Sequence, residues 1–342
     1  MTRRRPGADA AGVGLQEVRR RMAARGTRFA RAGRAGGAGA PSPLPDRPPR
    51  PPMGPAVGLV LLTGLTAVGL AGFLTVSELA APAGAAQARP ASAQEASAGT
   101  GSGSVSGSGG AVGDPLRATG EMTEVECPAP EVDPEDRESM EAFLHEITDC
   151  LDTAWKERFA EGGMDFEPPS RVFWYASGQS PCGNFPAEGT AAFYCQANKG
   201  LYLGVEDIVA DSWDGGHPET YTFVLGHEYA HHVQGEAGIL ARFHADRSAA
   251  SSAAERDRLT RRSELQANCL GGTFLGAVET SLPVGDEERE HILEDARRRG
   301  DYDSADRTHG TGENGALWTE HGMDRRDPAA CDTWSADGDL VE

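Results

Sequence analysis

The spacing of apolar residues separates an irregular first third of the chain from a patterned remainder. In the segment Asp133–Glu161, apolar side chains recur every three or four residues, which predicts a helix. Asp133 is the predicted N-cap and Pro134 the first helical position. The apolar stripe of this helix is interpreted as core, and it consists of Met140, Phe143, Leu144, Ile147, Leu151 and Trp155.

The same reasoning predicts a mainly helical domain with one small sheet. Further helices are predicted over Glu219–Gly235, Ala250–Glu279, Asp286–Arg299 and Gly312–His321. Runs of aromatic and apolar residues predict strands over Ser170–Ser177, Thr190–Ala197 and Gly200–Gly204. Only two residues separate the last two strands, so they are expected to form a hairpin. The predicted fold class is therefore α+β.

One segment lacks a polar face altogether. Ala56–Val76 is a run of 21 apolar, Gly and Thr residues, inside a stretch without charge between Arg50 and Glu78. A helix of this length crosses a hydrocarbon core of about 30 Å, so residues 56–77 are predicted to be a transmembrane helix. The alternatives are a buried helix of a soluble protein and a signal peptide cleaved within Ala81–Ala88. The 55 residues that precede the run argue against a signal peptide.

Charge and composition then divide the chain into segments. Residues 1–55 hold twelve arginines against three carboxylates and are predicted to be a disordered cytoplasmic segment. Residues 78–120 are rich in Gly, Ser and Ala and are predicted to be a flexible linker, followed by a folded extracytoplasmic domain over 121–342. The chain as a whole carries a net charge of −20, which argues against nucleic acid as a partner. A cytosolic protein that contacts nucleic acid through the arginines is the weaker alternative.

All six cysteines follow the predicted span, as expected for disulfides in an exported domain. Proximity in sequence favours Cys127–Cys150 and Cys182–Cys195, which leaves Cys269–Cys331 as the third pair. The alternative is that several of them are free buried thiols.

The clearest chemical signal is the stretch VLGHEYAHHVQ, residues Val224–Gln234. It contains the HExxH pattern, in which His227 and His231 lie four residues apart and so on one face of a helix, where they can share one Zn²⁺. Glu228 is placed to take a proton from a water on the metal. The neighbouring His232 is interpreted as a bystander and Tyr229 as a packing residue. The alternative is a surface helix with incidental histidines.

A catalytic zinc site needs three protein ligands and one open position. No further histidine follows His231 at the spacing of the extended motif, so the third ligand must come from elsewhere. The stretch RRSELQANC offers Glu264, and Asn268 four residues later is predicted to accept a hydrogen bond from a ligand histidine. The alternative for Glu264 is a surface residue paired with Arg261 and Arg262.

Several stretches together resemble the bacterial neutral zinc metallopeptidases, a membrane-anchored group related in its site to the gluzincins. They are LGHEYAHHVQ, RRSELQANC, FYCQANKGLYL, HGTGENGALWTEHG and DPAACDTW. The resemblance covers residues 121–336 and implies a zincin-like domain that acts on a protein or peptide substrate. It also implies His227, His231 and Glu264 as zinc ligands and Glu228 as general base.

The chain departs from the pattern of this family at two positions. Asn268 stands where an aspartate is usual, and Gly315 stands where an arginine is usual. An asparagine is a weaker acceptor than a carboxylate and supports a ligand histidine less. Both departures are compatible with an attenuated enzyme.

Two further features complete the prediction. His309 opens the stretch HGTGEN and is predicted to stabilise the oxyanion formed during hydrolysis, the alternative being a loop histidine before a helix capped by Thr311. Gly200–Gly204 is predicted to be an edge strand to which an extended substrate adds. The sequence thus predicts a single-pass, extracytoplasmic zinc metallopeptidase. The alternative is a catalytically inactive binding module stabilised by zinc and disulfides.

Overall fold

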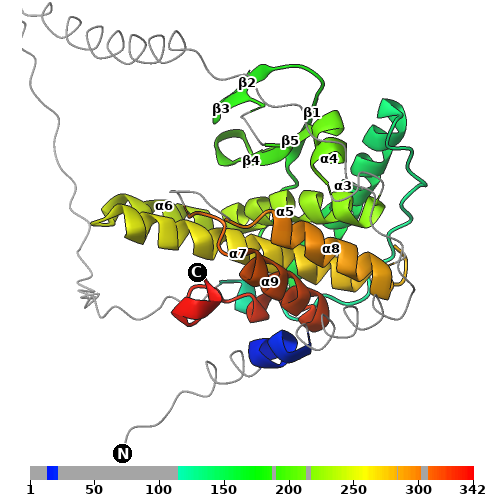
Figure 1. Ribbon diagram of the computed structural model, residues 1–342. Coiled ribbons are helices and arrows are strands. Elements are labelled where there is room, and N and C mark those ends of the chain that lie inside the picture. The colour runs from blue at the N-terminus through cyan, green and yellow to red at the C-terminus, as the bar shows by residue number, and fades with distance from the viewer. Residues whose placement is uncertain (1–13, 22–114, 187–189, 213–216, 283, 302–306) are drawn as a thin grey trace, which may run out of the picture. The chain divides into compact units, whose positions relative to one another are not determined.

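The computed structural model describes residues 14–21, 115–186, 190–212, 217–282, 284–301 and 307–342 (Figure 1). The α-helices are α3 (Arg137–Glu161), α4 (Val205–Asp211), α5 (Pro218–Glu236), α6 (Ile239–Ala249), α7 (Ala253–Val278), α8 (Asp286–Arg298) and α9 (Gly312–Arg325). The strands are β1 (Ser170–Trp174), β2 (Gly178–Ser180), β3 (Gly183–Phe185), β4 (Ala192–Cys195) and β5 (Gly200–Gly204). The predicted α+β class, mainly helical with a small sheet, is confirmed.

Helix α7 is the centre of the helical part, in contact with α5, α6 and α9 (Figure 1). Every residue from Leu265 to Val278 is buried, which requires neighbours on all sides of the helix. Small residues allow α7 and α9 to pack closely. A Cβ atom on Gly276 of α7 would overlap the backbone of α9, and one on Gly322 of α9 would overlap the backbone of α7. The second half of α7 is therefore held rigidly inside the domain.

Helix α3 begins later than the sequence predicts. Asp136, and not Asp133, is its N-cap, with a side chain that accepts a hydrogen bond from the backbone N–H of Glu138. Asp133 accepts from the N–H of Glu135 in a separate turn before the helix. The prediction of Asp133 and Pro134 as the helix start was wrong, because two aspartates three residues apart offer equivalent local caps. The predicted apolar stripe is buried as expected.

The three-stranded sheet has the order β1-β5-β4, with β5 parallel to β1 and antiparallel to β4. The predicted hairpin of β4 and β5 is thus confirmed, and its turn includes Lys199 in the left-handed conformation. The prediction of Gly200–Gly204 as an edge strand was wrong, because β5 pairs on both sides and all five of its residues are buried. Parallel pairing with β1 depends on a long crossover that no local pattern reveals. The edge strand on this side of the sheet is β4.

The remaining predicted helices are present, and several short elements were missed. Helices α5, α7 and α8 agree with the predicted bounds to within three residues at each end, whereas α9 continues four residues past His321, as far as Arg325. Strands β2 and β3 form a two-stranded sheet of three residues each, and α4 has seven residues. Elements of this length carry too few periodic positions to be detected.

All three preferred disulfides are present, namely Cys127–Cys150, Cys182–Cys195 and Cys269–Cys331. No free cysteine is found in the part of the chain that the structure describes, so the alternative of free thiols is excluded there. The third bond joins α7 to the segment that follows α9. The metal motif on α7 is thus covalently tied to the C-terminal part of the domain.

Residues 14–21 form a short helix, a departure from the disorder predicted for residues 1–55. Leu15 and Val18 are buried within the main apolar core, and Arg19 pairs with Asp339 at 3.3 Å. The predicted transmembrane helix over 56–77 lies outside the described residues, as does the linker up to residue 114. None of the helices within the described residues is long and apolar enough to cross a membrane.

Candidate metal centre

Two glycines bring the HExxH helix and the ELQAN helix together. Gly226 on α5 faces Gly271 on α7, and a Cβ atom at Gly271 would lie 3.1 Å from the backbone nitrogen of His227. Without side chains at the crossing, the two backbones approach closely. His227 on α5 and Glu264 on α7 therefore extend into the same space.

The three predicted zinc ligands meet at this crossing. The Nε2 atoms of His227 and His231 each lie 3.3 Å from Oε2 of Glu264. Donors that surround one tetrahedral zinc at 2.0–2.1 Å lie about 3.3 Å from one another. Both distances to Glu264 therefore match those that a zinc ion requires.

The other nitrogen of each imidazole is bound to a side-chain amide. Nδ1 of His227 lies 2.8 Å from Oδ1 of Asn268, and Nδ1 of His231 lies 2.9 Å from Oε1 of Gln234. An amide oxygen can only accept, so each Nδ1 carries the hydrogen and each Nε2 presents its lone pair to the metal position. The predicted bond of Asn268 is present, whereas the role of Gln234 was not predicted.

The charges at this group suit a cation. Burial alone would raise the pKa of the Glu264 carboxyl. The imidazoles of His231 and His227 nevertheless hold this pKa well below its usual range. Burial alone would lower the pKa of His231, but Glu264 raises it to about 9. An ionised carboxylate is thus held opposite two imidazoles, the donor set of catalytic zinc sites. The residues present fit Zn²⁺.

Glu228 lies beside the three ligands, as the motif predicts. Its Oε2 accepts a hydrogen bond of 3.1 Å from the backbone N–H of Tyr194 on β4. Burial raises the pKa of Glu228, against the opposing effect of His227 and His231. A carboxylate with a raised pKa is a stronger base, which suits a residue that must accept a proton.

These residues line a cleft of about 620 Å³. The lining includes residues of the edge strand β4, the two residues that precede it, and Arg299, the C-cap of α8. Although burial opposes its charge, Asp295 and Asp211 raise the pKa of Arg299. The lining of the cleft thus combines a strand edge with a fixed cation.

The structure also places the other candidate residues. His309 lies in the wall of the cleft, with its side chain 54% exposed and its Nδ1 3.7 Å from Asp301. Nε2 of His232 lies 2.7 Å from the backbone oxygen of Glu167, away from the ligand group. The hydroxyl of Tyr229 donates to Asp152. His232 and Tyr229 are thus the packed bystanders that the sequence predicts.

The alternative interpretation of Glu264 as a surface residue paired with Arg261 and Arg262 is not supported. Arg261 donates to the backbone oxygens of Val341 and Arg307, and Arg262 donates to those of Thr333 and Ala336. Both guanidinium groups hold the C-terminal segment against α7. The carboxylate of Glu264 points instead into the cleft.

Gly315 and Asn268, the two departures from the family pattern, are neighbours in the structure. A Cβ atom at Gly315 would lie 3.4 Å from the amide nitrogen of Asn268 and 3.0 Å from the backbone oxygen of Ala296. A larger residue at position 315 would therefore require α8 to shift. Gly315 thus lies next to the amide of Asn268, which binds Nδ1 of His227.

Sequence reasoning missed three features of this site: Gln234, Arg299 and the wall formed by β4. Gln234 is three residues from His231 on the same helix, a spacing that could have revealed it. Arg299 and β4 reach the cleft through tertiary packing, so the local sequence contains no signal for them.

Comparison with known proteins finds one family and several relatives. A model of the family described as "Putative neutral zinc metallopeptidase" matches residues 85–334. The uncharacterized protein YpfJ of Escherichia coli K12 is 28% identical over 204 residues, which cover 56% of this chain and 70% of that protein.

A mycobacterial relative is similarly distant. The uncharacterized protein Rv2575 of Mycobacterium tuberculosis H37Rv is 29% identical over 193 residues, or 49% of this chain and 63% of that protein. No solved structure gives a significant match.

Proposed function

The chain belongs to the neutral zinc metallopeptidase family, and from this membership we propose that it is a zinc-dependent peptidase acting on proteins or peptides. One observation carries the proposal: two imidazole nitrogens lie at equal distances of 3.3 Å from one carboxylate oxygen, beside the buried Glu228. His227, His231 and Glu264 would hold the metal. When bound, the zinc would supply a Lewis acid that lowers the pKa of water and polarises the scissile carbonyl.

Glu228 would then perform the proton transfers. Its carboxylate takes the proton of the attacking water and later delivers that proton to the nitrogen of the leaving amine. The raised pKa of Glu228 supports the first step, because a carboxylate with a higher pKa is a stronger base toward the attacking water. The hydrogen bond from Tyr194 would fix the carboxylate against the cleft wall.

The edge strand β4 is the proposed binding surface for an extended substrate. On one side β4 pairs with β5, and on the other side it borders the cleft. A peptide bound there would add a strand through backbone hydrogen bonds, which are independent of side-chain identity. This proposal transfers the predicted role of Gly200–Gly204 to Ala192–Cys195.

The oxyanion role predicted for His309 has a competing candidate in Arg299. Both side chains line the cleft, but His309 is half exposed whereas Arg299 is fixed by Asp295 at 2.7 Å and Asp211 at 3.2 Å. A group fixed in advance stabilises a developing charge better than one that must first be ordered. Loss of turnover at unchanged KM in His309→Ala, but not in Arg299→Gln, would support His309.

We also propose that the protein is anchored in the membrane by one helix over residues 56–77, with its domain outside the cytoplasm. The apolar run supports the anchor, and three disulfides support an oxidising compartment. A helix over 56–77 that crosses the membrane would separate residues 14–21 from the domain, so their contact and this topology exclude each other in one molecule. Protease added to intact cells should degrade the domain and spare an N-terminal tag, whereas a degraded tag would contradict the topology.

A second candidate is a non-catalytic module that binds protein or cell-wall material and uses zinc for stability. The amide of Asn268 favours it, because this group supports His227 less strongly than a carboxylate would. The discriminating experiment incubates the purified full chain with a mixed peptide library, in parallel with Glu228→Gln. Cleavage by the native chain alone supports the peptidase. Bound zinc without cleavage supports the module, and a chain that binds no zinc contradicts both.

A further inference from the structure

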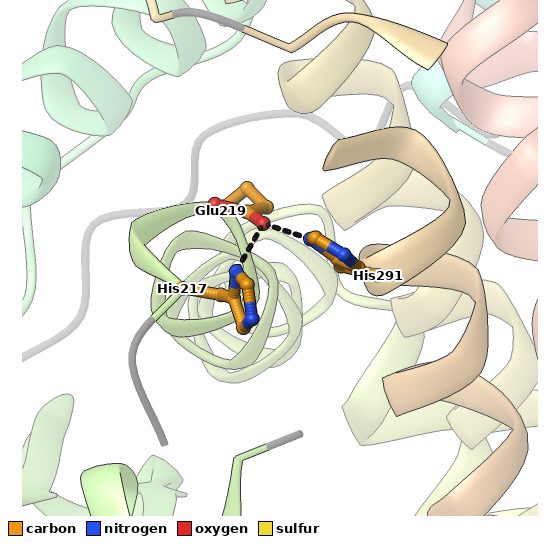
Figure 2. A group of neighbouring side chains, drawn as sticks. All are labelled: His217, Glu219 and His291. Atoms are coloured by element: carbon orange, nitrogen blue, oxygen red, sulfur yellow. Dashed lines mark hydrogen bonds and ion pairs between the residues drawn. The ribbon is translucent and has the colours of Figure 1, made fainter. Parts of the chain in front are cut away.

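A second group of two histidines and one glutamate lies apart from the cleft (Figure 2). Nδ1 of His291 is 2.7 Å from Oε1 of Glu219, and Nδ1 of His217 is 3.2 Å from the same oxygen. The two imidazole rings lie 4.0 Å apart between centroids. Three side chains with metal-binding atoms thus point to one position.

The fold brings these residues together from two helices. His217 is the N-cap of α5, and Glu219 lies in the first turn, where a carboxylate is favoured by the helix dipole. His291 belongs to α8, which packs against α5. The group therefore joins the start of the helix that carries HExxH to the helix that ends at Arg299.

The carboxylate of Glu219 is largely removed from solvent, with 7% of its side chain exposed. Burying a negative charge is costly unless a positive charge or several hydrogen bonds compensate it. The two histidines are charged only when protonated, so as neutral imidazoles they supply hydrogen bonds but no positive charge. A divalent cation between the three side chains would supply the missing charge.

The geometry is also suitable for a metal. One donor atom from each residue lies within 4.8 Å of the others. Around a tetrahedral zinc the donors are about 3.3 Å apart, so the 3.2 Å separation fits directly and the 2.7 Å separation must widen by roughly 0.6 Å. Two imidazole nitrogens and one carboxylate oxygen are a donor set that suits zinc.

We propose that His217, Glu219 and His291 form a second zinc site, distinct from the group in the cleft. None of the three is among the described residues that line the cleft, and Glu228 belongs to the other group. The site links α5 to α8 and so stabilises the wall that carries Arg299. The proposed role of this site is structural.

The test is a count of zinc in the purified full chain after loading with zinc and removal of excess metal. We expect two zinc ions per native chain, one in His291→Ala, one in His231→Ala and none in the double variant. His244→Ala is the matched control, because His244 is exposed on α6 and belongs to neither group, and it should retain two. One zinc in both the native chain and His291→Ala would overturn the proposal, as would two zinc ions in both.

A second variant guards against a failure of His291→Ala to fold. Glu219→Gln keeps the size and hydrogen bonding of the side chain but removes its charge, and it should also bind one zinc. Zinc should raise the melting temperature of His231→Ala, in which the cleft group is disabled, and should leave that of His231→Ala/His291→Ala unchanged. Equal zinc-induced shifts in these two variants would contradict the second site.

Discussion

The two groups of histidine and glutamate contain the same residue types but are constructed differently. In the cleft, two histidines one helical turn apart present Nε2 to Glu264, and amides bind their Nδ1 atoms. In the second group, Nδ1 atoms from two helices converge on Glu219. The first group lines a cleft of about 620 Å³ beside Glu228, whereas the second lies in the contact between α5 and α8. Similar donors are thus proposed to serve catalysis in the cleft and to hold α5 and α8 together in the second group.

The two groups differ in their surroundings and not in their residue types. The ligand set alone does not distinguish the two groups, since each offers two imidazoles and one carboxylate. What distinguishes them is the surrounding structure: a neighbouring base, oriented imidazoles and space for a substrate. Variants that change these surroundings test the comparison more sharply than variants that remove ligands.

The largest expected effect separates chemistry from metal binding. Glu228→Gln should lower peptide turnover about 1,000-fold, because a neutral amide cannot accept the proton of the attacking water. Zinc content should stay unchanged at both groups, since Glu228 is not a ligand. Turnover and zinc per chain are measured on the same preparation. Comparable turnover in Glu228→Gln and the native chain would contradict the proposed role of Glu228 as general base.

The next effect concerns His321, a histidine outside both groups. Its burial, together with Arg325, lowers the pKa of His321 to about 4. The neutral form is favoured in the folded state, so the stabilisation is complete above the unfolded pKa of about 6.5 and is lost as the pH falls toward 4. The loss amounts to about 3 kcal/mol over this interval.

Unfolding of the metal-free chain at pH 7 and pH 4.5, in the presence of a chelator, measures this loss. His321→Leu should show a clearly smaller decrease in the free energy of unfolding between the two pH values. His244→Ala serves as the exposed control and should behave like the native chain. The same acid sensitivity in all three proteins would show that the loss of stability comes from carboxylates or from the two histidine–glutamate groups, and not from His321.

Removal of an orienting amide should weaken one group and leave the other unchanged. Asn268→Ala deletes the partner of His227 Nδ1 and should lower zinc affinity in the cleft about 10- to 100-fold. Asn268→Asp should raise the affinity, because a carboxylate is the stronger acceptor. Titration against a chromogenic chelator resolves the two groups, and Asn184→Ala on β3 is the exposed control. Equal loss at both groups would contradict the proposed separation.

The smallest effect concerns the helix crossing that positions the cleft ligands. Gly271→Ala introduces a Cβ atom 3.1 Å from the backbone at Gly226 and His227, so the helices must separate by a few tenths of an ångström. We expect a loss of about 1–2 kcal/mol in stability, with weaker zinc binding in the cleft only. Gly338→Ala is the matched control, since an added Cβ there meets no atom within 4 Å. Identical melting temperatures of the two variants would contradict the close crossing.

Sequence reasoning predicted the cleft group well because its information is local. The spacing of His227 and His231 expresses one turn of a helix, and Glu264 with Asn268 repeats that spacing on a second helix. The structure brings these four residues together, and the hydrogen bond of Asn268 is as expected. The disulfides followed from separation along the chain.

The second group could not be predicted in this way. His217 and Glu219 lie two residues apart, which places them on different sides of a regular helix, and His291 is 72 residues from Glu219. Their meeting depends on the N-cap geometry of α5 and on the packing of α8. The wrong prediction of β5 as an edge strand has the same cause, because its central position depends on its pairing with β1.

The disulfide Cys269–Cys331 has a consequence for the order of events during synthesis. Cys269 follows directly on Asn268, the residue that orients His227, and its bond ties α7 to the segment after α9. Before oxidation, α7 and that segment are held together by non-covalent contacts alone. A chain with reduced cysteines should therefore bind zinc in the cleft more weakly than the oxidised chain. The proposed activity would then depend on the redox state of the compartment in which the chain folds.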